Sequence, residues 1–312
     1  MTSLLTEAFF VTIIGGMIPR AIPVLSAAMG EVVAQNSGVL NIGIEGYMLM
    51  GAIAAFAVDF TTSNLALAFL VGGATGAVFA VMHAVASVTL RADQIVSGTA
   101  IWFIGWGLSG VLYRAEFGSA SVAPTIKVIP PVQIPYLTSL PVIGPILFGQ
   151  DIVAYMIILS FIAIHYFLYH TRFGLNLRTV GENPRVAEIA GVDPIKYRYM
   201  ATAFCGFMSG IGGAYIVLAV VGSFYYDITA GIGFIAVALV YFGKWTPLRT
   251  FIGSLIFGLV YVSYLTLEIY FPNVPYQFFA MWPYLAALII IVVVGARSVS
   301  PGALAQPYSK EG

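Results

Sequence analysis

The chain has 312 residues, of which 60% are hydrophobic and only 8% are charged. A soluble domain carries about 25% charged residues, so this composition excludes an ordinary soluble protein and indicates an integral membrane protein. The 13 Lys and Arg residues balance the 13 Asp and Glu residues. The chain therefore lacks the basic surplus typical of nucleic-acid-binding proteins, and we expect an all-α polytopic membrane protein with no nucleic-acid partner.

Nine segments are long and apolar enough to be considered as membrane spans. A helix needs about 20 apolar residues to cross roughly 30 Å of hydrocarbon. We therefore expect about nine transmembrane helices (eight to ten) in a single domain, residues 1–312. Pro19 and Pro23 are expected to kink or interrupt the first span, and the seventh span is short, which is typical of a partial crossing. The predicted ranges are 8–30, 38–58, 64–90, 95–114, 151–170, 199–222, 231–243, 248–271 and 280–296.

Polar residues interrupt the apolar pattern between the first two spans. Asn36, Asn41 and Glu45 lie here, and Gly43 and Gly46 between and beside them would let the backbone open locally. Polar groups inside a membrane are costly and mark functional positions by default. One hypothesis is a translocation pathway that offers hydrogen bonds to a polar solute. The alternative is that Asn41 or Glu45 caps a broken helix or binds neighbouring backbone.

Glycine patterns predict close helix packing and hint at two related halves. Glycines recur through residues 72–76 and 206–213 on one helix face each, which permits close backbone approach in lipid. The segment Gly43-Ile44-Glu45-Gly46 also resembles Gly231-Ile232-Gly233. This similarity is weak, and it indicates an internal repeat without establishing one.

Basic residues predict the orientation of the chain. Cytoplasmic loops of membrane proteins carry an excess of Lys and Arg, and the loop 171–198 holds the densest basic cluster of the chain. We expect this loop to be cytoplasmic. Alternation of nine spans then places the proline-rich loop 115–150 and the N-terminus outside, and the C-terminus inside. The basic residues of the cytoplasmic loop are Arg172, Arg178, Arg185, Lys196 and Arg198.

Residues 181–194 form a polar island with two helix starts. Asn183-Pro184 combines a side-chain cap with a proline at the first helical position. Gly191 supplies the left-handed stop, and Asp193-Pro194 repeats the device for the next helix. The pattern predicts a short helix of about seven residues, which would suit docking into a cleft on another protein; the alternative is an ordinary connector. Its expected apolar face consists of Val186, Ala187, Ile189 and Ala190.

The sequence contains no signature of catalysis, nucleotide hydrolysis or metal binding. The phosphate-binding motif requires a glycine-rich loop before its lysine, and Ala238 stands where a glycine would be needed before Lys244. The histidines and Cys205 lack the spacing of metal ligands. We therefore expect no catalytic and no metal-binding residues in this chain.

Three motifs together resemble a known family. Ser37-Gly38-Val39-Leu40-Asn41-Ile42-Gly43-Ile44-Glu45-Gly46-Tyr47-Met48 is similar to the early motif of bacterial ABC-importer permeases of the simple-sugar and branched-chain amino-acid class, and residues 181–191 resemble their cytoplasmic coupling segment. Arg91-Ala92-Asp93-Gln94-Ile95-Val96-Ser97-Gly98 fits the branch associated with nucleoside uptake, although that branch often has Asn at the position of Asp93. The resemblance extends from about Ile22 to Arg297. The N-terminus is shorter than in ribose-type relatives.

The resemblance implies a type II-like permease bundle in the bacterial cytoplasmic (inner) membrane that works with other subunits. These would be an ABC ATPase, which binds ATP and Mg²⁺ while this chain binds no cofactor, a second permease that is identical or paralogous, and an extracytoplasmic substrate-binding lipoprotein. The expected solute is a nucleoside, and the alternatives are a simple sugar such as ribose or galactose, a branched-chain amino acid, or a stand-alone secondary transporter or channel. The resemblance assigns coupling to the ATPase to Gly181, Glu182, Asn183, Pro184, Arg185, Ala187, Glu188, Ala190 and Gly191.

Overall fold

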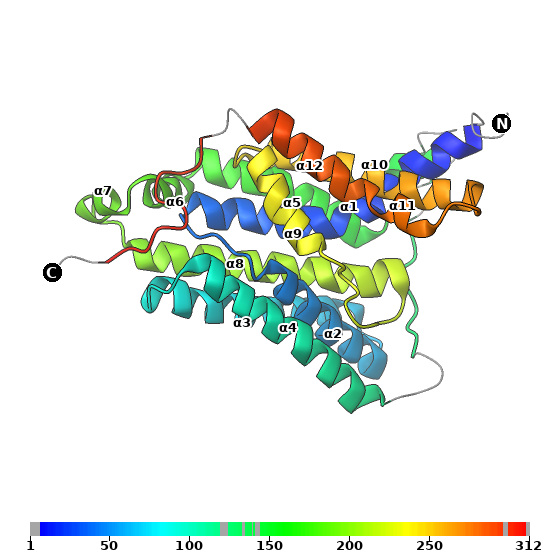
Figure 1. Cartoon of the computed structure of the whole chain (residues 1–312), viewed down its shortest axis with the longest axis horizontal. Coiled ribbons are helices and arrows are strands. Elements are labelled where there is room, and N and C mark those ends of the chain that lie inside the picture. Colours follow the sequence, from blue (N-terminus) through cyan, green and yellow to red (C-terminus); the bar gives the residue numbers. More distant parts are fainter. Residues whose placement is uncertain are drawn as a thin grey trace.

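The computed structural model of the chain describes residues 7–118, 124–132, 135–138, 140, 144–295 and 299–309. Within these ranges the structure is a helical bundle without β-strands, in which long helices lie side by side (Figure 1). The bundle also contains three π-helical segments, at Val85–Thr89, Gly144–Phe148 and Ile216–Val221. The α-helices are α1 (Glu7–Asn36), α2 (Ile44–Thr62), α3 (Leu65–Ala84), α4 (Gln94–Phe117), α5 (Ile152–His170), α6 (Arg172–Glu182), α7 (Pro184–Ile189), α8 (Pro194–Tyr215), α9 (Ile232–Phe242), α10 (Pro247–Tyr270), α11 (Tyr276–Ala280) and α12 (Trp282–Gly295).

Seven helices of the described chain are long and apolar enough to cross a membrane. Two further predicted spans appear as shorter helices, since α9 has 11 residues and α12 has 14. Each of the nine predicted segments thus coincides with a helix, and the predicted count of about nine is approximate because two of them fall short of a full crossing. The short α9 confirms the partial span expected there. The chain is a multi-pass membrane protein.

Polar side chains set the starts of several helices. Asn64 accepts a hydrogen bond from the backbone N–H of Leu67 at the start of α3, and Asp93 does the same for two N–H groups at the start of α4. Asp151 caps α5 and Thr171 caps α6 in the same manner. Each cap satisfies backbone donors that have no partner within the helix, so the boundaries follow from these residues.

The first two helices differ from their predicted ranges. Helix α1 continues to Asn36, and α2 begins only at Ile44, because residues 37–43 form a non-helical turn with Gly38 at a φ of +90°. Helix α1 runs through Pro19 and Pro23, so the expected interruption is wrong, whereas a kink at these prolines stays a prediction. Proline is tolerated inside transmembrane helices when neighbouring groups satisfy the freed backbone.

Helices α1 and α8 form the centre of the bundle. Helix α1 packs on α8, α10, α9 and α5, and α8 packs on α3, α1 and α2. The glycine pattern has the predicted effect, because a Cβ on Gly76 would lie 2.3 Å from the carbonyl oxygen of Gly206 and one on Gly213 would lie 1.9 Å from that of Met48. Only glycine allows the backbones of α3, α2 and α8 to approach so closely.

The two ends of the bundle differ in character. Helices α6 and α7 and the C-terminal segment lie at one end, whereas the start of α1, the end of α4 and α11 lie at the other (Figure 1). The end with α6 and α7 carries the basic cluster and is the predicted cytoplasmic end. At the opposite end, residues after α4 run beside the end of α8, where the N–H of Ile126 donates to the carbonyl of Gly222 at 2.8 Å. Arg297 and Lys310, which are near the C-terminus that the orientation prediction places inside, are outside the described residues.

Candidate functional site

The short helix predicted at residues 181–194 is present as α7. The Asn183 side-chain oxygen accepts from the N–H groups of Arg185 and Val186, each at 3.2 Å, and Pro184 occupies the first helical position. Gly191 ends the helix with a φ of +82°. Asp193 then caps α8 through the N–H groups of Ile195 and Lys196. The double cap fixes both ends of α7 at the predicted cytoplasmic end of the bundle.

The apolar residues of α7 do not share one face, which corrects the sequence-based expectation. Ala187 is fully buried against the rest of the chain, whereas 52% of Val186 and 88% of Ile189 are exposed. Ala190 is also exposed. Residues three and four apart share a helix face, so Val186, Ile189 and Ala190 project outward together and Ala187 points inward. A partner would contact the outward residues.

Gly181 and Glu182 connect α6 to two distant parts of the chain. A Cβ on Gly181 would lie 2.1 Å from the carbonyl oxygen of Asn36, so this glycine is required for contact with the end of α1. The carbonyl of Gly181 accepts from the N–H of Ala303 at 2.8 Å, and a carboxylate oxygen of Glu182 accepts from the N–H of Gly302 at 3.2 Å. The predicted coupling segment, residues 181–194, therefore touches both α1 and the C-terminal segment.

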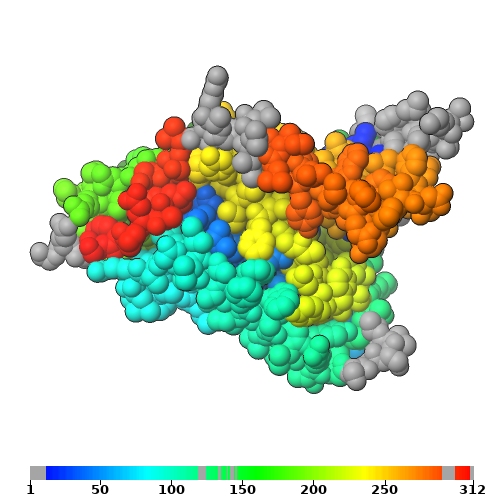
Figure 2. All heavy atoms as spheres, viewed as in Figure 1, coloured from blue at the N-terminus to red at the C-terminus, as the bar shows by residue number. Residues whose placement is uncertain are grey.

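The C-terminal segment, residues 299–309, braces α7 from the side. The hydroxyl of Tyr308 donates to the carboxylate of Glu188, and the N–H of Ala305 donates to the carbonyl of Gly38 at 3.2 Å. Figure 2 shows these C-terminal residues, in red, lying against the green surface of the coupling region. Burial and the bond to Glu188 raise the pKa of Tyr308 to about 12, so this hydroxyl remains a donor at physiological pH. Sequence reasoning did not identify this segment.

Arg198 ties the same elements together from the first turns of α8. Its side chain is fully buried, with Nε donating to the carbonyl of Ser37 at 3.3 Å and a terminal nitrogen donating to that of Gln306 at 3.0 Å. A buried cation near a membrane-spanning helix needs such acceptors. The sequence analysis counted Arg198 only as a basic loop residue. Its position beyond the Asp193-Pro194 helix start, inside the next helix, was the signal that could have singled it out.

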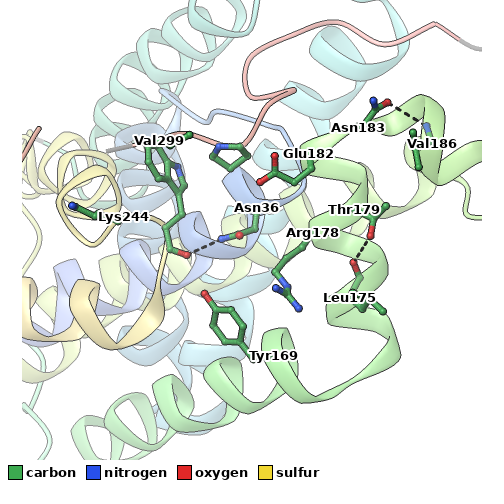
Figure 3. A pocket seen from close by; sticks show the side chains of 12 residues that line it. Asn36, Tyr169, Leu175, Arg178, Thr179, Glu182, Asn183, Val186, Lys244 and Val299 are labelled. Carbon is green, nitrogen blue, oxygen red and sulfur yellow. Dashed lines mark hydrogen bonds between the residues drawn. The ribbon is translucent and has the colours of Figure 1, made fainter. Parts of the chain in front are cut away.

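A cavity of about 490 Å³ lies beneath the coupling segment (Figure 3). Its walls come from the end of α1, the end of α5, α6 and α7, the turn after α9, and the C-terminal segment. Arg178 lies over the ring of Tyr169, 4.8 Å from its centroid. Asn36 donates to the carbonyl of Trp245 at 3.0 Å on the opposite wall. The cavity thus separates α6 and α7 from the turn that leads into α10.

The turn at residues 37–43 is anchored by a buried acid. The carboxyl group of Glu31 accepts from the backbone N–H of Asn41 at 3.0 Å and from its side-chain amide at 2.8 Å. It also accepts from Gln35 at 2.8 Å, and Gln35 in turn accepts from the indole N–H of Trp245 at 2.6 Å. The backbone N–H and the side-chain NH₂ of Asn41 are therefore bound to Glu31, whereas its buried amide oxygen has no hydrogen-bond partner among the described residues.

The same turn is held from its other side by α3 and α4. A ring nitrogen of His83 lies 3.2 Å from the carbonyl of Leu40, and its other nitrogen lies 3.3 Å from the hydroxyl of Ser97. The N–H of Leu40 donates to the side chain of Gln94 at 2.7 Å. His83 thus ties the turn to α3 and α4.

Glu45 joins the start of α2 to the start of α9. Its carboxyl oxygens accept from the hydroxyl of Thr229 at 2.5 Å and from the N–H groups of Gly231 and Gly233 at 2.7 and 2.6 Å. A Cβ on Gly233 would lie 2.6 Å from the backbone nitrogen of Glu45. The two stretches that resemble each other in sequence are therefore in contact, and Glu45 satisfies backbone donors at the start of a short helix.

The five residues predicted to form a solute pathway do not form one cluster. Asn36 lines the cavity below the coupling segment, Asn41 binds Glu31, and Glu45 binds the start of α9. Gly43 and Gly46 lie against α4, since a Cβ on Gly46 would be 2.8 Å from the carbonyl oxygen of Ile101. All five belong to the end of α1, the turn and the start of α2, so they are linked mechanically. Contact with solute stays a prediction for each of them.

Fold and site together define a polytopic membrane protein with a capped, outward-facing helix at one end and a buried polar junction behind it. Within the described residues, no three His, Cys, Asp or Glu side chains lie together in a way that could hold a metal ion. The sequence matches the family described as "Branched-chain amino acid transport system / permease component" over residues 6–299. The chain belongs to this family of permeases.

Relatives align over almost the whole chain. "Nucleoside ABC transporter permease protein NupC" of Lactococcus lactis subsp. cremoris is 34% identical, with 96% of each chain covered. "Putative glucose ABC transporter permease protein TsgC13" of Haloferax volcanii is 33% identical over 97% of this chain and 99% of the relative. "Guanosine ABC transporter permease protein NupQ" of Bacillus subtilis is 32% identical over 93% of this chain and 94% of the relative. No solved structure gives a significant match.

Proposed function

We propose that the chain is the permease subunit of an ATP-driven ABC importer that carries nucleosides across the cytoplasmic membrane. The observation that carries this proposal is α7, a doubly capped helix at the basic end of the bundle whose outward residues are apolar. An ordinary connector has no reason to expose Ile189 almost completely. The names of the relatives in Lactococcus lactis and Bacillus subtilis support the importer class and the solute.

The proposed machine contains partners at both membrane surfaces. An ABC ATPase, which binds ATP and Mg²⁺, would receive Val186, Ile189 and Ala190 in a cleft, with Arg185 beside it. A second permease, identical or paralogous, would complete the pathway, and an extracytoplasmic lipoprotein would deliver the solute. This chain would itself perform no catalysis.

The contacts of the coupling segment suggest how motion reaches the pathway. A shift of α7 would act on Tyr308 through Glu188, and a shift of α6 would act on Ala303 through Gly181. The C-terminal segment is bonded to Gly38, and Arg198 bonds both this segment and Ser37. The displacement would therefore arrive at the turn that carries Asn41 and leads to Glu45.

The cavity beneath the coupling segment supplies the space for this motion. Protein interiors are packed to a density of about 0.75, so closely packed elements move as one body. The space of about 490 Å³ between α6 and the turn after α9 allows α6 and α7 to approach or leave that turn without repacking the core. Two such packings, selected by the nucleotide state of the ATPase, are sufficient for alternating access.

A simple sugar is the second candidate solute, because a relative of comparable identity is named as a glucose permease. Both solutes are uncharged and rich in hydroxyl groups, and they differ in the nucleobase. Competition separates them. Uptake of labelled adenosine or uridine is measured with excess unlabelled guanosine or excess glucose. Inhibition by guanosine and not by glucose supports the nucleoside assignment. Inhibition by glucose and not by guanosine replaces it with a sugar.

Reconstitution tests the importer class. The chain is incorporated into proteoliposomes with the ATPase, the second permease and the lipoprotein from the same operon. We expect nucleoside uptake only with all components and hydrolysable ATP. Uptake by this chain alone, driven by an ion gradient, would identify a secondary transporter and refute the proposal. Ile189→Asp tests the role of α7. If this variant takes up nucleoside normally and still requires the ATPase, the importer class stands and the role of α7 is refuted.

A further inference from the structure

A second cavity lies inside the membrane part of the protein, between α5 and α8. Helix α5 packs on α1, α6 and α10, whereas α8 packs on α1, α2 and α3. The space between the two helices measures about 520 Å³ and has α1 as its floor. Its lining is almost entirely apolar and includes Val33, Ile164, Phe167, Met200, Phe204 and Met208.

This groove occupies the cytoplasmic half of the bilayer. Helix α8 begins at Pro194 at the cytoplasmic end, and the groove follows it from Met200 to Met208. Eight residues of helix extend about 12 Å, which is most of one leaflet of a hydrocarbon core about 30 Å thick. Ala163 at the rim is exposed, so the groove opens sideways toward the surrounding lipid.

Two exposed cations are close in the chain to residues that line the cytoplasmic end of the groove. Phe173, which lines the groove, packs against Tyr197 with the two rings tilted and their centroids 4.6 Å apart. Lys196 precedes Met200 by four residues and therefore lies on the same stripe of α8, one turn closer to the cytoplasm. Arg172 is the first residue of α6, next to Phe173, and both cations are exposed.

We propose that this groove is a binding site for an anionic phospholipid of the cytoplasmic leaflet. One acyl chain lies along Met200, Phe204 and Met208, and the phosphate group faces Lys196 and Arg172. An acyl chain matches an apolar groove that is open to the membrane, and the two cations select a negative headgroup over a zwitterionic one. The bound lipid fills the gap between α5 and α8 behind the coupling segment, so it also supports α6, which lines the groove with Phe173 and Leu177.

The proposal is tested by melting the purified full-length chain in detergent. Cys205 is the single cysteine and is fully buried, so a thiol-reactive dye reports unfolding. Phosphatidylglycerol, phosphatidylcholine with the same acyl chains, and glycerol 1-phosphate are added separately. We expect phosphatidylglycerol to raise Tm by about 2–4 °C, the effect of a ligand at several times its Kd, and native mass spectrometry to show one retained phosphatidylglycerol.

Variants locate the site. Ala163→Phe fills the groove from its exposed rim, and Lys196→Glu removes a rim cation; both are expected to abolish the shift and the retained lipid. The matched controls are Ala74→Phe on the exposed face of α3 and Arg91→Glu in the loop before α4. Both controls should keep the Tm shift and the bound lipid. An equal shift with phosphatidylcholine refutes the selection of an anionic lipid. A shift with glycerol 1-phosphate alone refutes the acyl-chain site, and an unchanged shift in Ala163→Phe places the lipid elsewhere and refutes the groove.

Discussion

Glu45 provides the sharpest test of the junction between α2 and α9. Its carboxyl group accepts three hydrogen bonds from Thr229, Gly231 and Gly233. A buried donor left without an acceptor costs about 1–3 kcal/mol. Glu45→Gln keeps the oxygen that serves Thr229 and Gly231 and turns an NH₂ group toward Gly233, so one donor is lost at about 1–3 kcal/mol. Glu45→Ala removes both acceptor oxygens and leaves all three donors without a partner, and we expect about three times that loss, less the desolvation energy of the carboxyl group.

The assay is the same dye-based melting curve, combined with uptake normalised to membrane abundance. At about 2 °C per kcal/mol for a chain of this size, Glu45→Gln should lower Tm by about 2–6 °C, and Glu45→Ala should lower it clearly further. Glu268→Gln, at a half-buried carboxyl group near the end of α10, is the control and should change Tm little. Equal melting of wild type and Glu45→Ala would refute the structural role. Normal uptake per molecule in both variants would remove Glu45 from the pathway.

Three further predictions concern coupling and packing. Ala187→Leu forces α7 away from the core against which Ala187 is buried. ATPase activity and capture of solute by the lipoprotein should persist, while uptake falls at least several-fold. Normal uptake would show that α7 does not transmit motion. Tyr308→Phe removes the bond to Glu188 and should lower uptake per ATP hydrolysed by about two- to fivefold without changing Tm by more than about 2 °C, whereas an unchanged ratio would exclude the C-terminal segment from coupling. Gly213→Ala places a methyl group 1.9 Å from the carbonyl oxygen of Met48 and should abolish folded protein in the membrane. The measurement is the yield of monodisperse protein after detergent extraction, and a yield equal to that of the wild type would contradict the close α2–α8 contact.

The caps and apolar runs made most of the helices predictable. Asn183-Pro184, Gly191 and Asp193-Pro194 act locally, through backbone donors and a left-handed turn within a few residues, so a sequence-based argument could place α7 correctly. The glycine stripes were predictable for the same reason, because small residues on one helix face have one dominant use in lipid.

The long-range contacts could not be predicted from the sequence. Tyr308 meets Glu188 across 120 positions, and Arg198 meets Ser37 across 161; no local pattern encodes such pairs. The direction of Ala187 also depended on tertiary packing, since a six-residue helix has too few residues to define a face by periodicity alone. For Glu45 the structure shows the backbone hydrogen bonds of the structural hypothesis, whereas the side chain of Asn41 bonds the carboxyl group of Glu31; solute contact stays a prediction for both.

The bracing of α7 by Tyr308 also has a consequence for biosynthesis. The residue that fastens Glu188 is synthesised 120 positions after it, which at about 5–20 residues per second corresponds to about 6–24 s of translation. Until Tyr308 has been synthesised, α7 of the nascent chain lacks the hydrogen bond from Tyr308 to Glu188. An ATPase that recognises the braced helix would therefore engage finished chains in preference to ribosome-bound ones, and this order would keep the motor from assembling on a pore that is still being inserted.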